Sequence, residues 1–110
     1  MENDAPLKQL GKIAQQIRSI LHTTEVDLDD TVVRKMTQSI LRNLEIAHKF
    51  LHDYESEEDV RLQALVLPQG IARLETLRKN ILDASQYNLF GAVDVAHLTA
   101  TIDQLIERLR

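Results

Sequence analysis

The sequence contains no cysteine and no tryptophan, and only two phenylalanines and two tyrosines among its 110 residues. Without cysteine, the chain cannot form disulfides, use a thiolate in catalysis, or bind zinc or an iron–sulfur cluster through sulfur. Because aromatic side chains are so few, a core must be built from leucine, isoleucine, valine and alanine, which pack well between helices. Disulfide-stapled secreted domains and cysteine enzymes are therefore excluded.

The chain also lacks an excess of positive charge and long apolar runs. Its 17 acidic and 13 basic residues give a net charge of -4, so its overall charge does not favour nucleic acid or an anionic membrane. No segment approaches the ~20 apolar residues that a membrane-spanning helix needs, and residues 1–4 are polar and acidic in the main. We therefore expect a cytoplasmic protein that contacts no membrane, and we do not expect nucleic acid as its partner.

Apolar residues recur along the sequence at alternating intervals of four and three residues. Residues three and four apart share one face of a helix, so each such segment carries a stripe that must be buried. The spacing predicts helices over residues 6–22, 31–54, about 57–67, about 71–88 and 95–110. With short connections between them, these helices are expected to pack as antiparallel neighbours.

Polar residues at these boundaries predict where the helices begin. Asp4 is placed to cap the first helix, and the acidic run 27–30 lies at the start of the second, where it favours the positive end of the helix dipole. Ser56, followed three residues later by Asp59, resembles a capping box for the third helix. Capping therefore explains the acidic runs without a bound cation.

Pro68 interrupts the helical pattern in the second half of the chain. Proline cannot donate a backbone hydrogen bond and disfavours a helical conformation at the preceding Leu67. We predict a break there, because Gly70 follows and a new apolar stripe begins after it, and we predict that Asp94 caps the last helix. The expected fold is an all-α, up-down helical bundle of four to five helices in one domain, residues 1–110, with some apolar stripes wide enough to serve a dimer as well.

The densest cluster of functional side chains is Glu45, His48 and His52. A Glu-x-x-His pair and two histidines four residues apart could point toward one metal ion. Helical di-iron sites need that motif twice, however, and His22 and His97 are the only other histidines. We expect no metal and no other cofactor, and keep these three residues as the alternative, a metal-binding bundle.

Arg42, Asn43 and His48 resemble the Arg-x(4 to 6)-His signature of the HEPN ribonucleases. The resemblance implies a helical bundle in which the Arg and His of two subunits form a composite RNA-cleaving site, here with Arg42 and His48. On an uninterrupted helix these two side chains point ~120° apart, so they converge only if the helix breaks between them. HEPN-like RNA cleavage is thus the enzymatic alternative to a protein without catalytic activity.

His97 invites comparison with the histidine phosphotransfer domains, which are helical bundles of about this length. Those domains typically follow the histidine with a lysine and a glycine, whereas Thr99 and Thr101 follow here. In the first turn of a helix the dipole disfavours a charged imidazole. We therefore expect His97 to be a partly buried, neutral histidine.

The apolar stripes themselves indicate the simplest function. We expect a regulatory or protein–protein interaction module, homodimeric, whose partner docks a helix against an apolar seam. The contact surface is predicted at the Leu89–Phe90 loop and along the last helix, because apolar residues in a loop usually pack on something. Its predicted residues are Leu89, Phe90, Leu98, Ile102 and Leu105. A structural subunit of a larger assembly is a further alternative.

Overall fold

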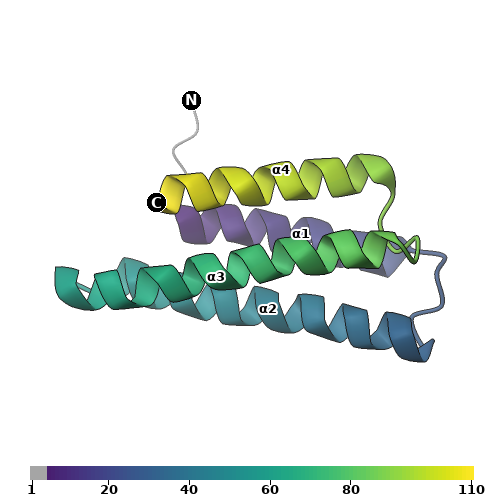
Figure 1. Ribbon diagram of the computed structural model, residues 1–110, viewed down its shortest axis with the longest axis horizontal. Helices are drawn as coiled ribbons and strands as arrows, with labels where there is room; N and C mark the ends of the chain where they lie inside the picture. Colours follow the sequence, from purple (N-terminus) through teal and green to yellow (C-terminus); the bar gives the residue numbers. More distant parts are fainter. Residues whose placement is uncertain (1–4) are drawn as a thin grey trace.

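The computed structural model describes residues 5–110, and this part of the chain folds into four α-helices without any β-strand (Figure 1). Helix α1 spans Pro6–Thr23, α2 spans Thr31–Ser56, α3 spans Val60–Ser85 and α4 spans Ala92–Leu109. The all-α prediction is confirmed. The number of helices in the described residues is the lower of the two predicted values.

Two aspartates of the acidic runs cap helices, and the second of them, Asp59, takes the cap position that the sequence pattern assigned to Ser56. Asp30 Oδ1 accepts hydrogen bonds from the backbone N–H groups of Val32 and Val33, at 3.1 and 3.3 Å. Asp59 Oδ1 accepts from the backbone N–H of Arg61 at 2.9 Å. These N–H groups have no partner within their own helix, so the side-chain oxygens stabilise the starts of α2 and α3.

Three other predicted boundaries differ or lie outside the described residues. Asp4, the predicted cap of α1, is outside them. The hydroxyl of Ser56 donates to the carbonyl of His52 at 2.7 Å, so Ser56 ends α2 instead of capping α3. Asp94 lies inside the first turn of α4, which begins at Ala92.

The predicted break at Pro68 was wrong, because α3 continues through it. The carbonyl of Ala64 loses its helical partner there, but both residues are exposed and the carbonyl can accept from water instead. Gly70, two residues on, is buried against α2. The side chains of Phe50 and Leu51 lie 3.5 Å from the place where a Cβ of Gly70 would be. Packing on α2 therefore holds α3 in one piece.

The helices pack in a ring in chain order, with α4 returning to contact α1 (Figure 1). Neighbouring helices run in opposite directions, which gives the up-down arrangement. Their buried faces form one hydrophobic cluster that draws on all four helices. Its fully buried large side chains are Leu10, Ile13, Ile17, Ile40, Leu51, Leu74, Leu77, Ile81, Leu98, Ile102 and Leu105.

The two central helices are longer than the outer two. α2 and α3 each contain 26 residues, whereas α1 and α4 each contain 18. At ~1.5 Å per residue the difference is about 12 Å. Figure 1 shows that the start of α3 extends past the end of α4 and the beginning of α1. The end of α4 meets α3 near Glu75, which lies 3.7 Å from Arg110. Residues 60–71, which we name the α3 extension, precede that point and lack the cover that α4 gives the rest of α3.

Candidate functional site

The five apolar residues predicted to bind a partner lie in the core of the bundle. Leu98, Ile102 and Leu105 have 0% exposed surface, and Leu89 and Phe90 have only 3% and 2%. Their side chains pack against the hydrophobic cluster of the same chain. The expectation that the Leu89–Phe90 loop is exposed was therefore wrong, and in this fold these side chains present no contact surface.

Leu89 and Phe90 are buried because of the way α3 ends. Asn88 adopts a left-handed conformation with φ of 61°, and the backbone N–H of Leu89 donates to the carbonyl of Ala84 at 3.4 Å. This is the pattern of a Schellman helix end, in which the residue after the left-handed one packs back on the last turn. The turn directs Leu89 toward the buried Ala84 and brings Phe90 into the core behind it.

The alternative metal ligands Glu45, His48 and His52 lie on an exposed flank of α2, around a shallow open hollow. His52 Nδ1 lies 3.8 Å from a carboxylate oxygen of Asp53, and both side chains are largely exposed. Over residues 5–110, no three His, Asp or Glu side chains are grouped so that they could hold a metal ion. The structure therefore places the three residues on one flank without bringing them together.

The HEPN-like residues are separated by the helix that carries them. α2 runs unbroken from Thr31 to Ser56, so Arg42 and His48 keep their different directions. Asn43 is buried, with 7% of its surface exposed, and its side-chain oxygen accepts from the guanidinium of Arg73 at 3.4 Å. Asn43 thus joins α2 to α3, and the break that the two candidate catalytic residues need is absent.

His97 is exposed on α4, contrary to the expectation of partial burial. It lines an open groove between α1 and α4 to which Lys12 and Gln16 of α1 also contribute. The backbone carbonyl of His97 accepts from the hydroxyl of Thr101 at 2.7 Å. Positive groups therefore lie along the same groove, Lys12 from α1 and Arg108 from the end of α4, together with the carboxylates of Asp103 and Glu107.

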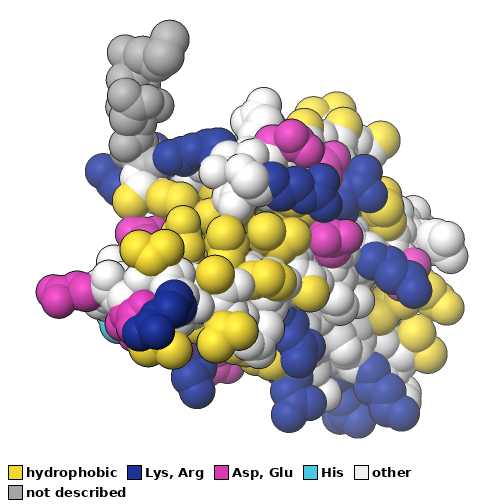
Figure 2. Space-filling view, turned by 60° about the vertical axis from the view of Figure 1, so that its left-hand side comes forward, with side chains coloured by type: hydrophobic (Ala, Val, Ile, Leu, Met, Phe, Trp, Pro, Cys, Tyr) yellow, Lys and Arg dark blue, Asp and Glu magenta, His cyan; other side chains and the backbone are white. Residues whose placement is uncertain are grey.

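The α3 extension exposes an apolar surface that the sequence analysis missed. Val60 is 73% exposed, Leu65 66% and Leu62 46%, and Ala64 and Pro68 are exposed as well. Figure 2 shows hydrophobic side chains gathered over this end of the molecule. A helix that is apolar on all sides is normally buried, and exposed apolar patches commonly mark contact surfaces. The α3 extension is therefore the candidate functional site.

The apolar character of the α3 extension can be read from the sequence once the helix is known to continue through Pro68. Between Val60 and Ile71 only Arg61, Gln63 and Gln69 have polar side chains. The predicted break at Pro68 divided this run into two ordinary pieces, so its all-round apolar character was overlooked. Even Gln63 is turned inward, since its amide donates to two backbone carbonyls at the end of α2, at 2.9 and 2.8 Å.

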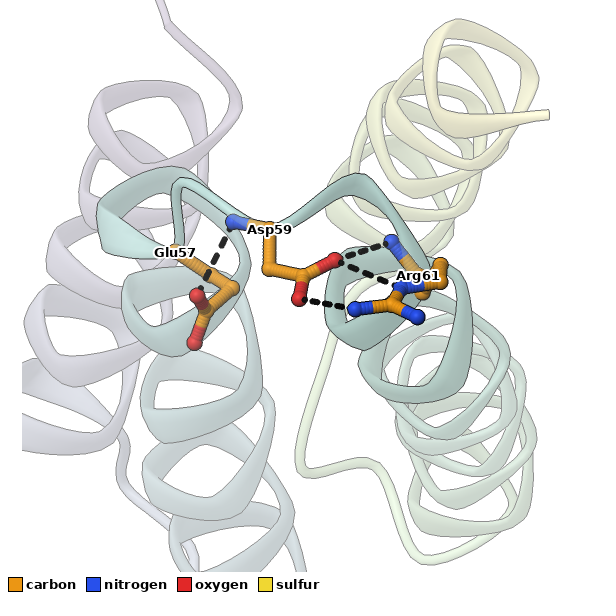
Figure 3. Close-up of polar contacts among 3 residues, drawn as sticks. All are labelled: Glu57, Asp59 and Arg61. Atoms are coloured by element: carbon orange, nitrogen blue, oxygen red, sulfur yellow. Dashed lines mark hydrogen bonds and ion pairs between the residues drawn. The ribbon is translucent and has the colours of Figure 1, made fainter.

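An acidic turn leads into the α3 extension (Figure 3). Glu57 accepts from the backbone N–H of Asp59 at 3.0 Å, and Asp59 in turn faces Arg61, with the guanidinium Nη2 3.2 Å from Oδ2. The side-chain hydrogen bond from Arg61, followed by its backbone N–H, lowers the pKa of Asp59 below its ordinary value. Glu58 adds a further exposed carboxylate, so the turn is net negative.

Comparisons with protein-family models, with curated proteins and with solved structures found no match to this chain. Within the described residues, none of the helices has both the length and the apolar character that crossing a membrane requires. The class that the fold defines is thus a four-helix all-α protein, and its function must be argued from the exposed surface.

Proposed function

We propose that this protein is a small interaction module, regulatory or adaptor in role and without catalytic activity, that binds a protein partner through the α3 extension. One observation carries the proposal: the first half of α3 is largely apolar and exposes Val60, Leu62 and Leu65, although the rest of the core is closed. The cytoplasm remains the predicted location, on the sequence alone.

The exposed side chains add little to the stability of the isolated chain but would add to a complex. Fully burying a valine or leucine side chain contributes about 1.5 to 3 kcal/mol. Val60, Leu62 and Leu65 still have most or nearly half of their surface available for such burial. Helix-in-groove recognition uses apolar side chains three or four residues apart, as Leu62 and Leu65 are, so a helical partner surface suits the α3 extension.

No described contact favours the enzymatic or metal-binding alternative. Arg42 and His48 do not meet, and Glu45, His48 and His52 do not converge. These residues nevertheless supply a control, since His48 is exposed and lies on α2 away from the α3 extension. Its substitution separates a chemical role of the histidine from a role of the apolar surface.

The test is affinity capture from the cells of origin with three tagged proteins: the parent, an Ala64→Glu, Leu65→Glu double variant, and a His48→Ala variant. All three sites are exposed, so helical circular dichroism should be the same. We expect a protein in stoichiometric amount with the parent and with His48→Ala, and its loss with the double variant. Metal content and RNA cleavage are measured on the same samples.

Retention of the captured protein by the double variant would contradict the proposal. So would RNA cleavage or bound metal in the parent that His48→Ala abolishes, because the alternative function would then be established. Equal helical content and equal thermal midpoints among the three proteins ensure that the comparison concerns the surface and not folding.

A further inference from the structure

Building on the proposed function, we propose that the partner of the α3 extension is a second copy of this chain, with the two α3 extensions packed antiparallel about a twofold axis. Three features of the structure lead to this arrangement: the side of α3 that α4 leaves uncovered, the spacing of the apolar residues along that side, and the charges at its two ends.

The uncovered side of α3 continues the side that α4 covers. Residues seven apart lie on nearly the same side of a helix, so the positions one and two heptads before Leu74 and Arg78 continue the side of α3 that faces α4. Leu74 is fully buried, and Arg78 Nε lies 2.9 Å from a carboxylate oxygen of Asp103 on α4. The positions one and two heptads earlier, which we name the α3 seam, are Val60, Ala64, Leu67 and Ile71. Val60 and Ala64 are exposed, whereas Leu67 and Ile71 are partly buried against the core and keep part of their surface open.

The α3 seam is complementary to itself. Its 4-3-4 spacing reads the same in both directions, so in an antiparallel pair Val60 lies opposite Ile71 of the second copy, and Ala64 lies opposite Leu67. A twofold interface requires such reciprocal contacts, and a small residue facing a large one lets two helices interdigitate. The second copy's α3 then lies in line with α4 and, like α4, runs antiparallel to the α3 that it covers.

The charges at the ends of the α3 seam favour this direction. The acidic turn, Glu57 to Asp59, precedes the seam. The last turn of α4 carries Arg108 and is followed by Arg110, which lies beside the carboxylates of Glu75 and Glu107. In the antiparallel pair, the acidic turn of one copy meets the end of α4 of the other. Opposite charges and opposite ends of helix dipoles then come together. A parallel pair would instead place two acidic turns side by side, and like charges oppose that arrangement.

Arg110 can contact the second copy although it also makes contacts in its own chain. Arg110 lies 3.7 Å from Glu75 and 3.5 Å from Glu107 in its own chain, and its side chain is still 56% exposed. Both of those pairs are at the surface and individually weak. An approaching carboxylate such as Glu58 can therefore compete with Glu75 and Glu107 for the exposed guanidinium.

The first experiment is sedimentation equilibrium of the purified full chain, with a matched pair of variants. We expect a parent species of twice the 12.6 kDa chain mass. Ala64→Glu places two carboxylates at the centre of the seam and should raise the dimer dissociation constant about 100-fold or more. Leu65→Glu changes the neighbouring exposed residue, which lies off the seam, and should leave the dimer intact.

The second experiment exchanges the charges at the two ends. Arg110→Glu and Glu58→Arg should each weaken the dimer about tenfold at low salt. The chain that carries both should recover, because each copy then presents the opposite pair. Neither residue is in the core, so this comparison does not depend on a variant that fails to fold. Recovery would support the antiparallel contact, and its absence would overturn it.

A monomeric parent at 100 µM or more would overturn the second-copy proposal, as would a dimer that Ala64→Glu leaves unchanged or that Leu65→Glu disrupts equally. The outcomes that would overturn the proposed function are different. If the parent is monomeric but the Ala64→Glu, Leu65→Glu variant loses a captured protein of another kind, the interaction module stands and only its partner was wrong. If the capture is also unchanged, both are wrong.

Discussion

At the scale of single residues, Asp59 shows how one side chain determines a helix boundary. Its Oδ1 accepts a hydrogen bond from the backbone N–H of Arg61 at 2.9 Å, and its carboxylate also accepts hydrogen bonds from the Arg61 guanidinium. Both contacts favour the ionised carboxylate and lower its pKa below the ordinary value of 3.8. Because the pKa is lower in the folded chain than in the unfolded chain, ionised Asp59 stabilises the fold.

We therefore expect a pH-dependent effect of Asp59→Asn. The contribution of the charge is fully present above pH 3.8 and is lost as the pH falls through the lowered pKa. Asparagine still caps a helix but does not titrate, so the variant should be less stable than the parent at neutral pH and approach it in acid. Thermal melts from pH 7 to pH 2 measure this difference.

Glu58→Gln is the control for that experiment, since it removes one negative charge from the same turn without touching a cap. A stability difference between parent and Asp59→Asn that stays constant over the whole acid range would show that the ionised carboxylate is not what stabilises the start of α3.

At the scale of helices, α3 shows how tertiary packing overrides a local signal. Proline and glycine at positions 68 and 70 together favour a helix end. The proline lies on the solvent side and the glycine lies against α2, at a distance where even an added Cβ would make only an ordinary contact. The sequence pattern contains neither fact, because both depend on which face of α3 meets α2.

Pro68→Ala should consequently stabilise the protein. Alanine restores the hydrogen bond to the carbonyl of Ala64 and suits a helix interior better than proline by about 3 kcal/mol. Part of that gain is offset, because the unfolded chain regains the freedom that proline restricts. We expect a net increase of about 1 to 2 kcal/mol in the free energy of unfolding by urea denaturation.

Gln69→Ala, at the adjacent exposed position, is the matched control and should change stability by no more than about 0.5 kcal/mol. A loss of stability in Pro68→Ala would mean that a bend at the proline improves the packing of α3 on α2, contrary to the account given above.

The starts of α1 and α2 were predictable from sequence, and the ends of both helices lie within two residues of the prediction. Spacing is a local signal that both helices obey, and the start of α2 also has the side-chain cap of Asp30. The candidate site was not predictable in the same way. It depends on which helices are neighbours and on where along α3 they pack, since α4 contacts the later part of α3 and not the α3 extension. Contacts between distant segments decide that outcome.

At the scale of the whole molecule, the connection between α3 and α4 closes one end of the bundle. Leu89 and Phe90 are 3% and 2% exposed and belong to the hydrophobic cluster. An apolar pair in a connection indicates burial, but the sequence does not reveal whether its own chain or a partner covers it. Here the left-handed turn at Asn88 directs the pair inward.

Phe90→Ala should therefore lower the free energy of unfolding. Removing a buried phenylalanine side chain costs about 3 to 5 kcal/mol, which is a large share of the stability of a domain of this size. Val93→Ala, close by on α4 but 83% exposed, should cost no more than about 0.5 kcal/mol. Urea denaturation followed by circular dichroism compares the two. Similar small losses would indicate that the connection opens in solution.

Because the helices form a closed ring, the same core could be built by a chain whose ends lie at a different point of the ring. α1 begins beside the end of α4 (Figure 1), where the Arg108 guanidinium donates to the side chain of Gln9. A flexible linker could join these ends, and the chain could be opened between α1 and α2 instead, as is often tolerated when termini are close. Such a circular permutant would retain the same core and the same α3 extension, with its new termini at the opposite end of the bundle.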